Sequence, residues 1–385
     1  MKKIIIDSTP ILNNMSGVGF YIKNLIHGIS KLGHKNHTII VKSYQPGLKK
    51  WLKSVLWTKK QSILEENNQY YLPLPVRFSN LLLDYYPQFF PKYWEPILEA
   101  PDIVHGTNYT VFPYKNCRKV MTIYDLTFLK YPDYIDSVVK QYGRRVKKCL
   151  QWTDLVLTIS ESSKRDIVEY LNFDPERVVV TPLASRYTEQ TLETLPKPPV
   201  DLGYDFRKPY LLFVSTLEPR KNITTLIAAF NRLKEQYKID HELVLIGQKG
   251  WRYEPIFKAI ASSPYHHHIH HLNYLPDELV ALFYSQAEAF IYPSHYEGFG
   301  LPVLEAMTLG APVITSNTSS LPEVAGEAAI LIDPNEVEDL TQGILKVISD
   351  SQLRTDLIQK GKHRAKLFSW ERTAQETLAA YQKIL

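Results

Sequence analysis

The feature that most constrains the fold of this chain is a short apolar run followed by a glycine loop and the start of a helix. Residues 288–292 are mostly apolar and β-prone, and a Pro-Ser pair ends the run, so we expect a buried parallel strand followed by a loop. Gly298 and Gly300 allow the loop backbone to approach a ligand closely, and Pro302 suits a first helical turn. The amides near Gly300 and Leu301 are then unpaired donors at a positive helix end, which predicts an anion site.

Two glutamates flank this predicted anion site. Glu297 lies in the loop and Glu305 lies further along the helix, so both carboxylates can face one ligand, one at each end. A phosphate alone does not favour two carboxylates nearby. A pyrophosphate flanked by hydroxyl-rich groups does, because carboxylates accept paired hydrogen bonds from neighbouring hydroxyls. The pattern therefore indicates a nucleotide sugar.

The complete string resembles the signature of the retaining glycosyltransferases of family 4. It consists of two glutamates with seven residues between them, five of which are Gly298, Phe299, Gly300, Leu301 and Pro302. The resemblance implies that Glu297 contacts the transferred sugar, that Glu305 contacts the ribose, and that the loop between them binds the donor. Two glutamates at this spacing alone would more often be solvated surface groups, whereas the full string after a strand is far more specific.

Length, charge and cysteine content agree with a two-domain intracellular enzyme. A chain of 385 residues is long for one core and divides naturally into two domains. Two cysteines, Cys117 and Cys149, argue against a disulfide framework. No run reaches the roughly 18 apolar residues of a membrane span, and the N-terminal run is short for a signal peptide. We expect a cytoplasmic protein, with a net charge of +5 that suits anionic ligands or a membrane surface and does not require nucleic acid.

The N-terminus predicts a second glycine loop. Residues 4–6 indicate a buried strand, and a helix is expected over residues 19–32, closed by Gly33. Gly17 and Gly19 lie between the two elements, but a third glycine at Rossmann spacing is missing, so the pair alone is a weak signal. Family members carry a similar loop that approaches the donor, which by resemblance makes Gly17 a donor-binding candidate.

A basic amphipathic helix is predicted over residues 48–64. Leu48, Trp51, Leu52 and other apolar residues recur at helical spacing, and the opposite face carries Lys49, Lys50, Lys53, Lys59 and Lys60. The pattern is typical of a segment that lies on an anionic membrane surface, peripheral at its inner face. A surface helix packed on its own domain explains the pattern equally well. Both interpretations stay open.

Two further strands end in polar residues. Residues 102–105 and 119–125 predict these strands, and open α/β sheets bind ligands at the carboxyl edge, so His105 and Asp125 are candidates for the catalytic centre. A lone histidine there is more often structural. The string T-I-Y-D-L-T-F-L-K-Y-P resembles mannosyltransferase-like family members, which usually carry a catalytic histidine before the Asp. Here that residue is Tyr124, which leaves its catalytic role open.

A second domain is predicted to hold most of the donor. A strand at 210–214 precedes Arg220 and Lys221, which lie at the start of a helix expected over 223–237. Cations at a helix N-terminus suggest that an anion is bound there, so we expect two exposed charges that bind an anionic ligand. The alternative is an exposed pair that contacts only solvent. The segment resembles the one that grips the donor pyrophosphate in the family. The loop with Leu275 resembles the one that frames the nucleobase.

The histidines at residues 266–271 do not predict a metal site. His270 and His271 point to opposite faces of a strand, and no carboxylate or cysteine shares their spacing. A proline-rich stretch at 195–199 is expected to link the domains. We place an acceptor-side domain at 1–190, a nucleotide-sugar-binding domain at 205–368, and a C-terminal helix at 369–385 that packs back across the domain gap.

Strands alternate with helices in both halves, which predicts two doubly wound Rossmann-like α/β domains. The resemblance names this the GT-B fold, with the two domains facing a central cleft. It implies a retaining glycosyltransferase that moves a sugar from GDP-mannose or a UDP-sugar to a saccharide or lipid-linked acceptor in cell-surface polysaccharide or glycolipid synthesis. Neither a metal nor a cofactor is expected, because Arg220, Lys221 and the helix end can neutralise the leaving diphosphate. The alternatives are a sugar-nucleotide epimerase on the same fold and a non-catalytic, membrane-associated homologue.

Overall fold

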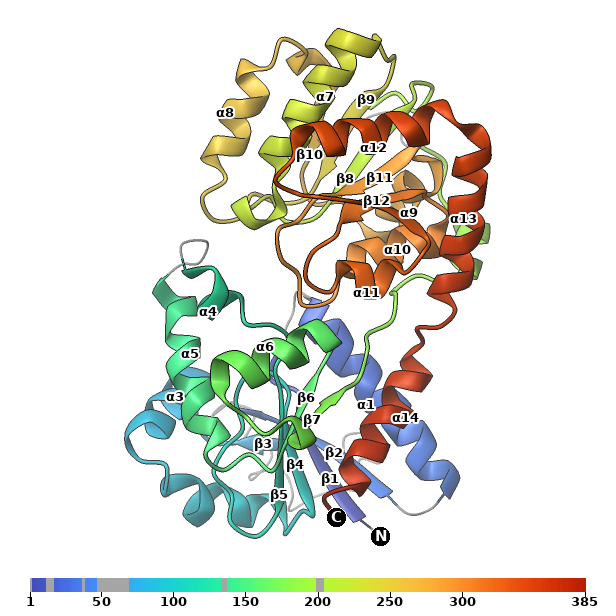
Figure 1. Ribbon diagram of the computed structural model, residues 1–385. Coiled ribbons are helices and arrows are strands. Elements are labelled where there is room, and N and C mark those ends of the chain that lie inside the picture. Colours follow the sequence, from blue (N-terminus) through green and yellow to red (C-terminus); the bar gives the residue numbers. More distant parts are fainter. Residues whose placement is uncertain (1, 12–16, 37–38, 47–68, 133–136, 199–203) are drawn as a thin grey trace. The chain divides into compact units, whose positions relative to one another are not determined.

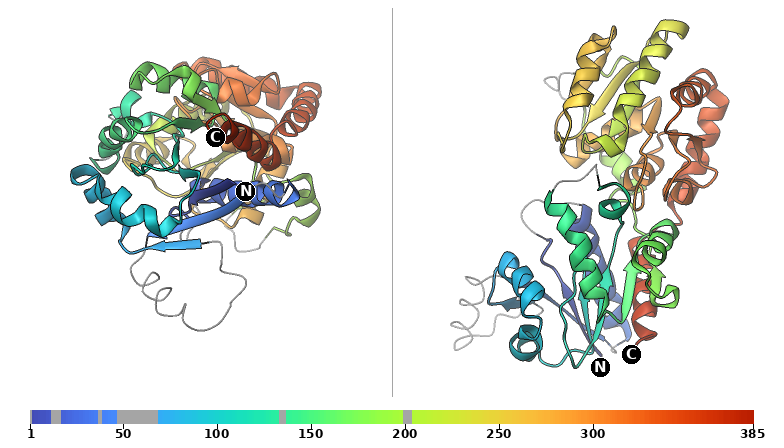
Figure 2. Two further views of the ribbon diagram at one scale, coloured as in Figure 1. Left: turned by 90° about the horizontal axis from the view of Figure 1, so that it is seen from below. Right: turned by 60° about the vertical axis from the view of Figure 1, so that its left-hand side comes forward.

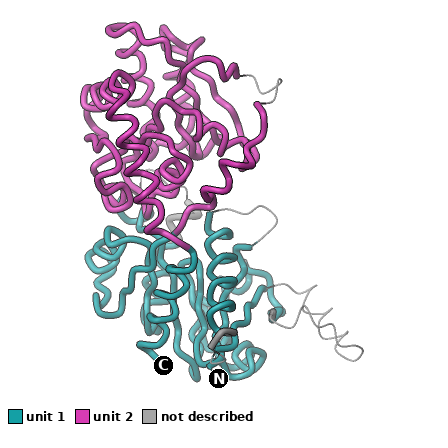
Figure 3. Tube along the Cα trace, turned by 90° about the vertical axis from the view of Figure 1, so that its right-hand side faces the viewer, with its two compact units in different colours: residues 1–130, 137–183, 370–385 teal, residues 131–136, 184–369 magenta. Residues whose placement is uncertain are grey.

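The computed structural model describes residues 2–11, 17–36, 39–46, 69–132, 137–198 and 204–385. The predicted basic helix at 48–64 lies outside these residues. The chain divides into two compact units, coloured separately in Figure 3. Unit 1 comprises Met1–Lys130, Ser137–Leu183 and Trp370–Leu385, and unit 2 comprises Tyr131–Asp136 and Ala184–Ser369.

Unit 1 is built on a parallel sheet whose described strands follow the order β3-β2-β1-β4-β5-β6-β7. The strand order reverses between β1 and β4, where Ile4 pairs with Ile103. The three isoleucines of β1 are fully buried, as expected for a central parallel strand with helices on both faces. The strands are β1 (Lys2–Asp7), β2 (Ile39–Pro46), β3 (Gln69–Leu72), β4 (Ile103–Gly106), β5 (Arg118–Thr122), β6 (Leu155–Thr158) and β7 (Val178–Val180).

Helices cover both faces of this sheet (Figures 1 and 2). In Figure 1, α1 and α14 lie together on one side of the sheet and α3 and α5 on the other. Lys148 joins α5 to α3 by donating a hydrogen bond from Nζ to the carbonyl oxygen of Asp84. The helices of unit 1 are α1 (Gly17–Asn36), α3 (Val76–Tyr85), α4 (Thr127–Lys130), α5 (Ser137–Leu150), α6 (Glu161–Leu171) and α14 (Trp370–Gln382).

The predicted end of α1 at Gly33 is wrong. The helix continues through Gly33 to Asn36. A Cβ atom at Gly33 would lie 3.1 Å from the carbonyl oxygen of Ile39, so the missing side chain allows β2 to pass close to the helix. This glycine serves packing rather than helix termination.

The last helix of the chain, α14, packs on α1 within unit 1. A Cβ atom at Gly28 would lie 2.7 Å from the Cβ of Ala374, so the two helices approach as closely as a glycine permits. The rings of Phe20 and Trp370 meet edge to face at 5.7 Å. Thr373 donates a hydrogen bond from Oγ1 to the carbonyl oxygen of Pro182, at 2.6 Å. The last helix therefore belongs to unit 1.

Unit 2 repeats the same winding with the strand order β10-β9-β8-β11-β12-β13, all parallel. The order reverses between β8 and β11, where Leu212 pairs with Phe290. The strands are β8 (Tyr210–Val214), β9 (Glu242–Ile246), β10 (Ile269–Leu272), β11 (Ala289–Tyr292), β12 (Val313–Ser316) and β13 (Ala329–Ile332). The two doubly wound α/β sheets expected from the sequence are confirmed.

The helices of unit 2 form two layers, with α7 packed between α8 and α12 and α10 packed between α9 and α13. None of the helices within the described ranges is long and apolar enough to cross a membrane. The helices are α7 (Ile223–Tyr237), α8 (Glu254–Ser262), α9 (Asp277–Gln286), α10 (Leu301–Leu309), α11 (Leu321–Ala325), α12 (Val337–Ser349) and α13 (Ser351–Ala365).

Candidate active site

The candidate active site lies in unit 2 where the strand order reverses, at the carboxyl ends of β8 and β11. Open α/β sheets bind ligands at this point because the loops after the two strands diverge there. Here the loops are tied to each other. The amide of His295 donates to the carbonyl oxygen of Arg220 at 2.9 Å, and Oγ of Ser294 lies 3.1 Å from the same oxygen.

Three charged side chains predicted from the sequence meet at this point. The carboxylate of Glu297 pairs with Nζ of Lys221 at 2.5 Å and with Nη1 of Arg220 at 3.0 Å. Ser294 donates a hydrogen bond to the same carboxylate at 2.7 Å, and Lys221 also donates to the hydroxyl of Tyr292 at 2.7 Å. The side chains of the loop after β8 and the loop after β11 therefore form one polar cluster.

Arg220 and Lys221 are not the exposed pair that the sequence suggested. Their side chains are 12% and 7% exposed, and the Glu297 side chain is 10% exposed. Burial alone would raise the pKa of Glu297, but the adjacent Arg220 and Lys221 lower it to about 2. Burial and Arg220 lower the pKa of Lys221. Glu218 pairs with Arg220 at 2.7 Å, so two cations and two carboxylates are held together.

The loop before α10 has the conformation that its glycines predict. Gly300 has a φ of 109°, a left-handed backbone conformation that residues with a side chain rarely adopt, and α10 starts at the next residue. Oγ of Ser320 holds the loop, because it lies within hydrogen-bond distance of the carbonyl oxygens of Glu297 and Phe299, at 2.9 and 2.8 Å, and can donate its proton to either. In the described part of the chain, the structure gives the amides of Gly300 and Leu301 no acceptor, so the helix end retains free donors.

Glu305 lies just beyond the first turn of α10 and is almost fully buried. Its Oε1 accepts a hydrogen bond from Nε of Arg186 at 2.7 Å. Nη1 of Arg186 in turn pairs with Asp277 at 3.1 Å, at the start of α9. Leu275 is half-buried two residues before Asp277. Arg186 was missed from the sequence because it belongs to no motif and lies in the irregular segment that follows unit 1.

His105 does not fit the expected catalytic role. It is fully buried in unit 1, with Nδ1 hydrogen bonded to the hydroxyl of Tyr381 and Nε2 to Oγ1 of Thr122, both at 2.7 Å. Burial lowers its pKa to about 3. Both ring nitrogens are occupied, so His105 is a structural residue that links β4 to β5 and α14.

The depressed pKa of His105 makes the stability of unit 1 depend on pH. In the folded protein the His105 side chain stays neutral. Its contribution to the free energy of unfolding is therefore present above the unfolded pKa of 6.5 and is lost as the pH falls towards 3. Between pH 7.5 and about pH 5 we expect the wild type to lose about 2 kcal/mol more stability than His105→Gln. Urea unfolding at both pH values measures this. Equal losses would contradict it, and His27→Gln on the exposed face of α1 is the matched control.

The other predicted residues of unit 1 lie at the carboxyl edge of its sheet. Tyr124 is buried and its hydroxyl donates to the carbonyl oxygen of Thr107 at 2.6 Å. Burial raises the pKa of the Tyr124 hydroxyl well above its usual value. Asp125 is partly exposed and accepts a hydrogen bond from the amide of Thr127 at 3.0 Å. Gly17 is exposed at the first turn of α1, and residues 12–16 before it lie outside the described chain.

Asp7 is a candidate that the sequence analysis missed. It ends β1, where the strand order of unit 1 reverses. Burial raises its pKa to about 6, although the hydroxyl and amide of Thr9 donate hydrogen bonds to it. A carboxyl group with a pKa near neutrality at a strand end is typical of a site that handles protons. The available signal was its position, an acid between the first strand and the glycine loop.

The histidines at 266–271 have a carboxylate partner that the sequence did not reveal. Glu242, on the neighbouring strand β9, pairs with Nε2 of His270 at 2.7 Å and Nδ1 of His268 at 3.1 Å. Lys208 also pairs with Glu242, at 3.0 Å, so the carboxylate already has a permanent cation. Among the described residues, no group of three or more His, Cys, Asp or Glu is arranged to hold a metal ion.

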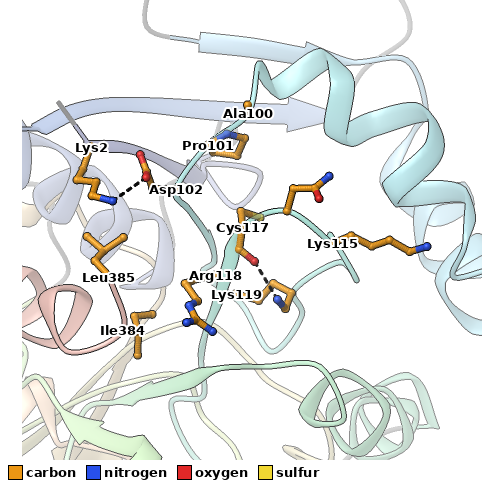
Figure 4. Close-up of a pocket in the computed structure, with 11 residues that line it drawn as sticks. Lys2, Ala100, Pro101, Asp102, Lys115, Cys117, Arg118, Lys119, Ile384 and Leu385 are labelled. Carbon is orange, nitrogen blue, oxygen red and sulfur yellow. Dashed lines mark hydrogen bonds and ion pairs between the residues drawn. The ribbon is translucent and has the colours of Figure 1, made fainter.

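A hollow of about 500 Å³ in unit 1 is lined by none of these candidates. Figure 4 shows the residues that line it. It lies beside Lys2 and Arg118, the first residues of β1 and β5, and so at the amino edge of the sheet. Its charges are already paired in part, because Lys2 lies 3.0 Å from Asp102. Ligands of open α/β sheets bind at the opposite edge, so we assign no function to this hollow.

The sequence matches two family descriptions, Glycosyltransferase Family 4 over residues 15–184 and Glycosyl transferases group 1 over residues 200–364. It is 30% identical to the O-antigen chain mannosyltransferase B of Escherichia coli, over 99% of each chain. The chain belongs to glycosyltransferase family 4. It is therefore a glycosyltransferase of a retaining family, as its E-G-F-G-L-P-V-L-E string indicated.

Other comparisons agree with this family and show its fold. The MMP alpha-(1->4)-mannosyltransferase of Mycolicibacterium hassiacum is 31% identical over 60% of this chain and 54% of its own. Sucrose-phosphate synthase from Thermosynechococcus elongatus matches with a TM-score of 0.73 at 19% identity, covering 100% and 99% of the two chains. Anabaena Alr3699/HepE, solved with UDP and glucose, matches at 0.67 and 15% identity over 100% of both chains. These structures show that the family 4 chain has the GT-B fold, which confirms the prediction.

Proposed function

We propose that this family 4 enzyme transfers a mannosyl or other hexosyl group, with retention, from a nucleoside diphosphate sugar to a saccharide or lipid-linked acceptor. Similarity to mannosyltransferases favours GDP-mannose over a UDP-sugar as the donor. Similarity to the O-antigen chain mannosyltransferase favours a role in cell-surface polysaccharide synthesis. The observation that carries the proposal is the buried cluster of Glu297, Arg220 and Lys221 beside the amides at the start of α10.

The proposed mechanism assigns one part of the donor to each group of the site. The diphosphate binds Arg220, Lys221 and the amides at the start of α10, which stabilise the charge that develops on the leaving group. Glu297 contacts hydroxyls of the transferred sugar, and Glu305 contacts the ribose. The bond from the anomeric carbon to the diphosphate breaks, the acceptor oxygen attacks from the same face, and the leaving phosphate takes the acceptor proton. These protein groups supply the needed charge, so the proposal includes no metal.

Turnover with and without acceptor tests this proposal. The purified protein is incubated with GDP-mannose or UDP-glucose, and both nucleoside diphosphate release and the sugar products are measured. We expect release that depends on acceptor and a product with the donor's anomeric configuration. A donor converted to its epimer without acceptor would indicate the epimerase instead. No change in any donor, with or without a saccharide acceptor, would indicate the non-catalytic homologue.

The segment at 48–64 supports a second, independent proposal, that the enzyme attaches peripherally to anionic membranes. Five lysines at about 1 kcal/mol each near a charged surface suffice for reversible attachment. We expect co-sedimentation with vesicles of anionic lipid at low salt and little at high salt.

The matched comparison for this attachment uses two charge variants. Changing Lys49, Lys50, Lys53, Lys59 and Lys60 to Gln should abolish co-sedimentation. The same change at exposed lysines elsewhere, Lys238, Lys258, Lys346, Lys360 and Lys383, should leave most of it. Co-sedimentation that survives the first set would show that the segment does not bind the membrane.

A further inference from the structure

Arg186 makes a contact with the site that neither the sequence motifs nor the proposed mechanism uses. Its Nε donates to Oε1 of Glu305 at 2.7 Å, and its Nη1 pairs with Asp277 at 3.1 Å. Glu305 and Asp277 belong to different helices, α10 and α9, so the guanidinium bridges two elements of unit 2. Its planar fork fixes the direction of both bonds.

Within the described chain, Arg186 is the cation that pairs with Glu305, and the other groups named near this carboxylate carry no positive charge. Burial and the nearby charge of Glu305 raise the pKa of Tyr187, which follows Arg186, and of Tyr284 on α9. The hydroxyl of Tyr187 donates to the carbonyl oxygen of Asp277 at 3.1 Å, so it does not bind Glu305. Asp277 adds a second negative charge nearby. Glu305 is 4% exposed at its side chain, an expensive place for a carboxylate without a cation.

We propose that Arg186 is a positioning residue for the ribose of the donor, holding Glu305 by one oxygen so that the other meets the ribose hydroxyls. The inference rests on the proposed function, because it needs a nucleotide at this site. Within the described residues Oε2 of Glu305 has no hydrogen bond, so it keeps its lone pairs for the two hydroxyls. Asp277 anchors the far side of the guanidinium, so Arg186 can hold Glu305 in one orientation.

Charge gives Arg186 a second effect on the same oxygen. Burial raises the pKa of Glu305 above its usual value, and Arg186 opposes that rise. Without Arg186 the carboxyl would take up a proton more readily, and a protonated carboxyl is a poorer acceptor for hydroxyl groups. Nucleotide binding by an Arg186 variant should therefore weaken further as the pH falls.

Calorimetric titration with GDP, UDP and their 2′,3′-dideoxy analogues tests the proposal. Arg186→Gln should weaken binding of the ribonucleotide about tenfold near pH 8 and more near pH 6. It should not change binding of the dideoxy analogue, which has no hydroxyls for Glu305. Arg186→Lys should recover part of the loss. In a Glu305→Gln background, Arg186→Gln should add nothing, because both changes act on the same oxygen.

The control is Arg232→Gln, which breaks an exposed ion pair with Glu338 in the same unit and should bind like wild type. Equal weakening of the ribonucleotide and dideoxy forms by Arg186→Gln would overturn the proposal, because the residue would then contact the phosphates or the base, or support the fold. Unchanged ribonucleotide binding would overturn it as well. A wild type that binds no nucleotide would instead refute the proposed function and this inference with it.

Discussion

Glu297→Gln is expected to lower kcat by about 100- to 1,000-fold while leaving nucleoside diphosphate binding unchanged or tighter. The amide keeps the shape of the carboxylate but cannot stabilise the positive charge that develops on the transferred sugar in the transition state. Removing the carboxylate also leaves Arg220 and Lys221, which it contacts at 3.0 and 2.5 Å, with more positive charge for the diphosphate. Turnover and nucleotide affinity should therefore change independently.

Steady-state kinetics beside diphosphate titrations measure both quantities. Glu305→Gln should show the opposite pattern, with weaker binding of the free diphosphate and the intact donor alike, because every donor form retains the ribose. Glu327→Gln, an exposed position in the same unit, controls for the loss of one negative charge. Near-normal turnover of Glu297→Gln, or a selective loss of diphosphate affinity in it, would reverse the assigned roles of the two glutamates.

Lys221→Met is expected to lower the free energy of unfolding by about 3 to 5 kcal/mol, because it leaves the buried carboxylate of Glu297 without its closest cation. Lys221→Met combined with Glu297→Gln should recover most of this loss, since the charge is then absent on both sides. Diphosphate binding should not recover with it, because the cation that meets the anion is still missing. Folding and binding thus separate in the double variant.

Chemical denaturation of the two single variants and the double variant measures the coupling. Lys346→Met, at an exposed position of α12, is the control. Because the pKa of Glu297 falls from 4.5 to about 2 in the folded protein, the wild type should also lose this contribution as the pH drops from about 4.5 towards 2. Additive losses in the double variant would show that the buried pair does not stabilise the fold.

Local patterns in the sequence predicted most of the secondary structure of unit 2. The strand β8 (Tyr210–Val214) and the helix α7 (Ile223–Tyr237) have the predicted bounds. β8 is a short, continuous apolar run, and α7 has apolar residues at helical spacing and is followed by Lys238. The glycine loop before α10 was equally predictable, because Gly300 has a positive φ, a conformation that residues other than glycine rarely adopt.

Contacts between distant segments were not predictable in the same way. The burial of Lys221 depends on Glu297 and Tyr292, which lie more than seventy residues away. The structural role of His105 depends on Tyr381 in the last helix. Arg186 and Glu305 meet only because the irregular segment after unit 1 passes α10. Spacing along one chain carries no signal for such pairs.

We propose that the nucleotide sugar binds where β8 and β11 end, and a crystal structure of the protein with GDP bound tests this placement. We expect diphosphate oxygens within about 3 Å of Arg220, Lys221 and the amides of Gly300 and Leu301, and the ribose hydroxyls on Glu305. A nucleotide bound elsewhere in the protein, with the contacts between Glu297 and these two cations undisturbed, would contradict it.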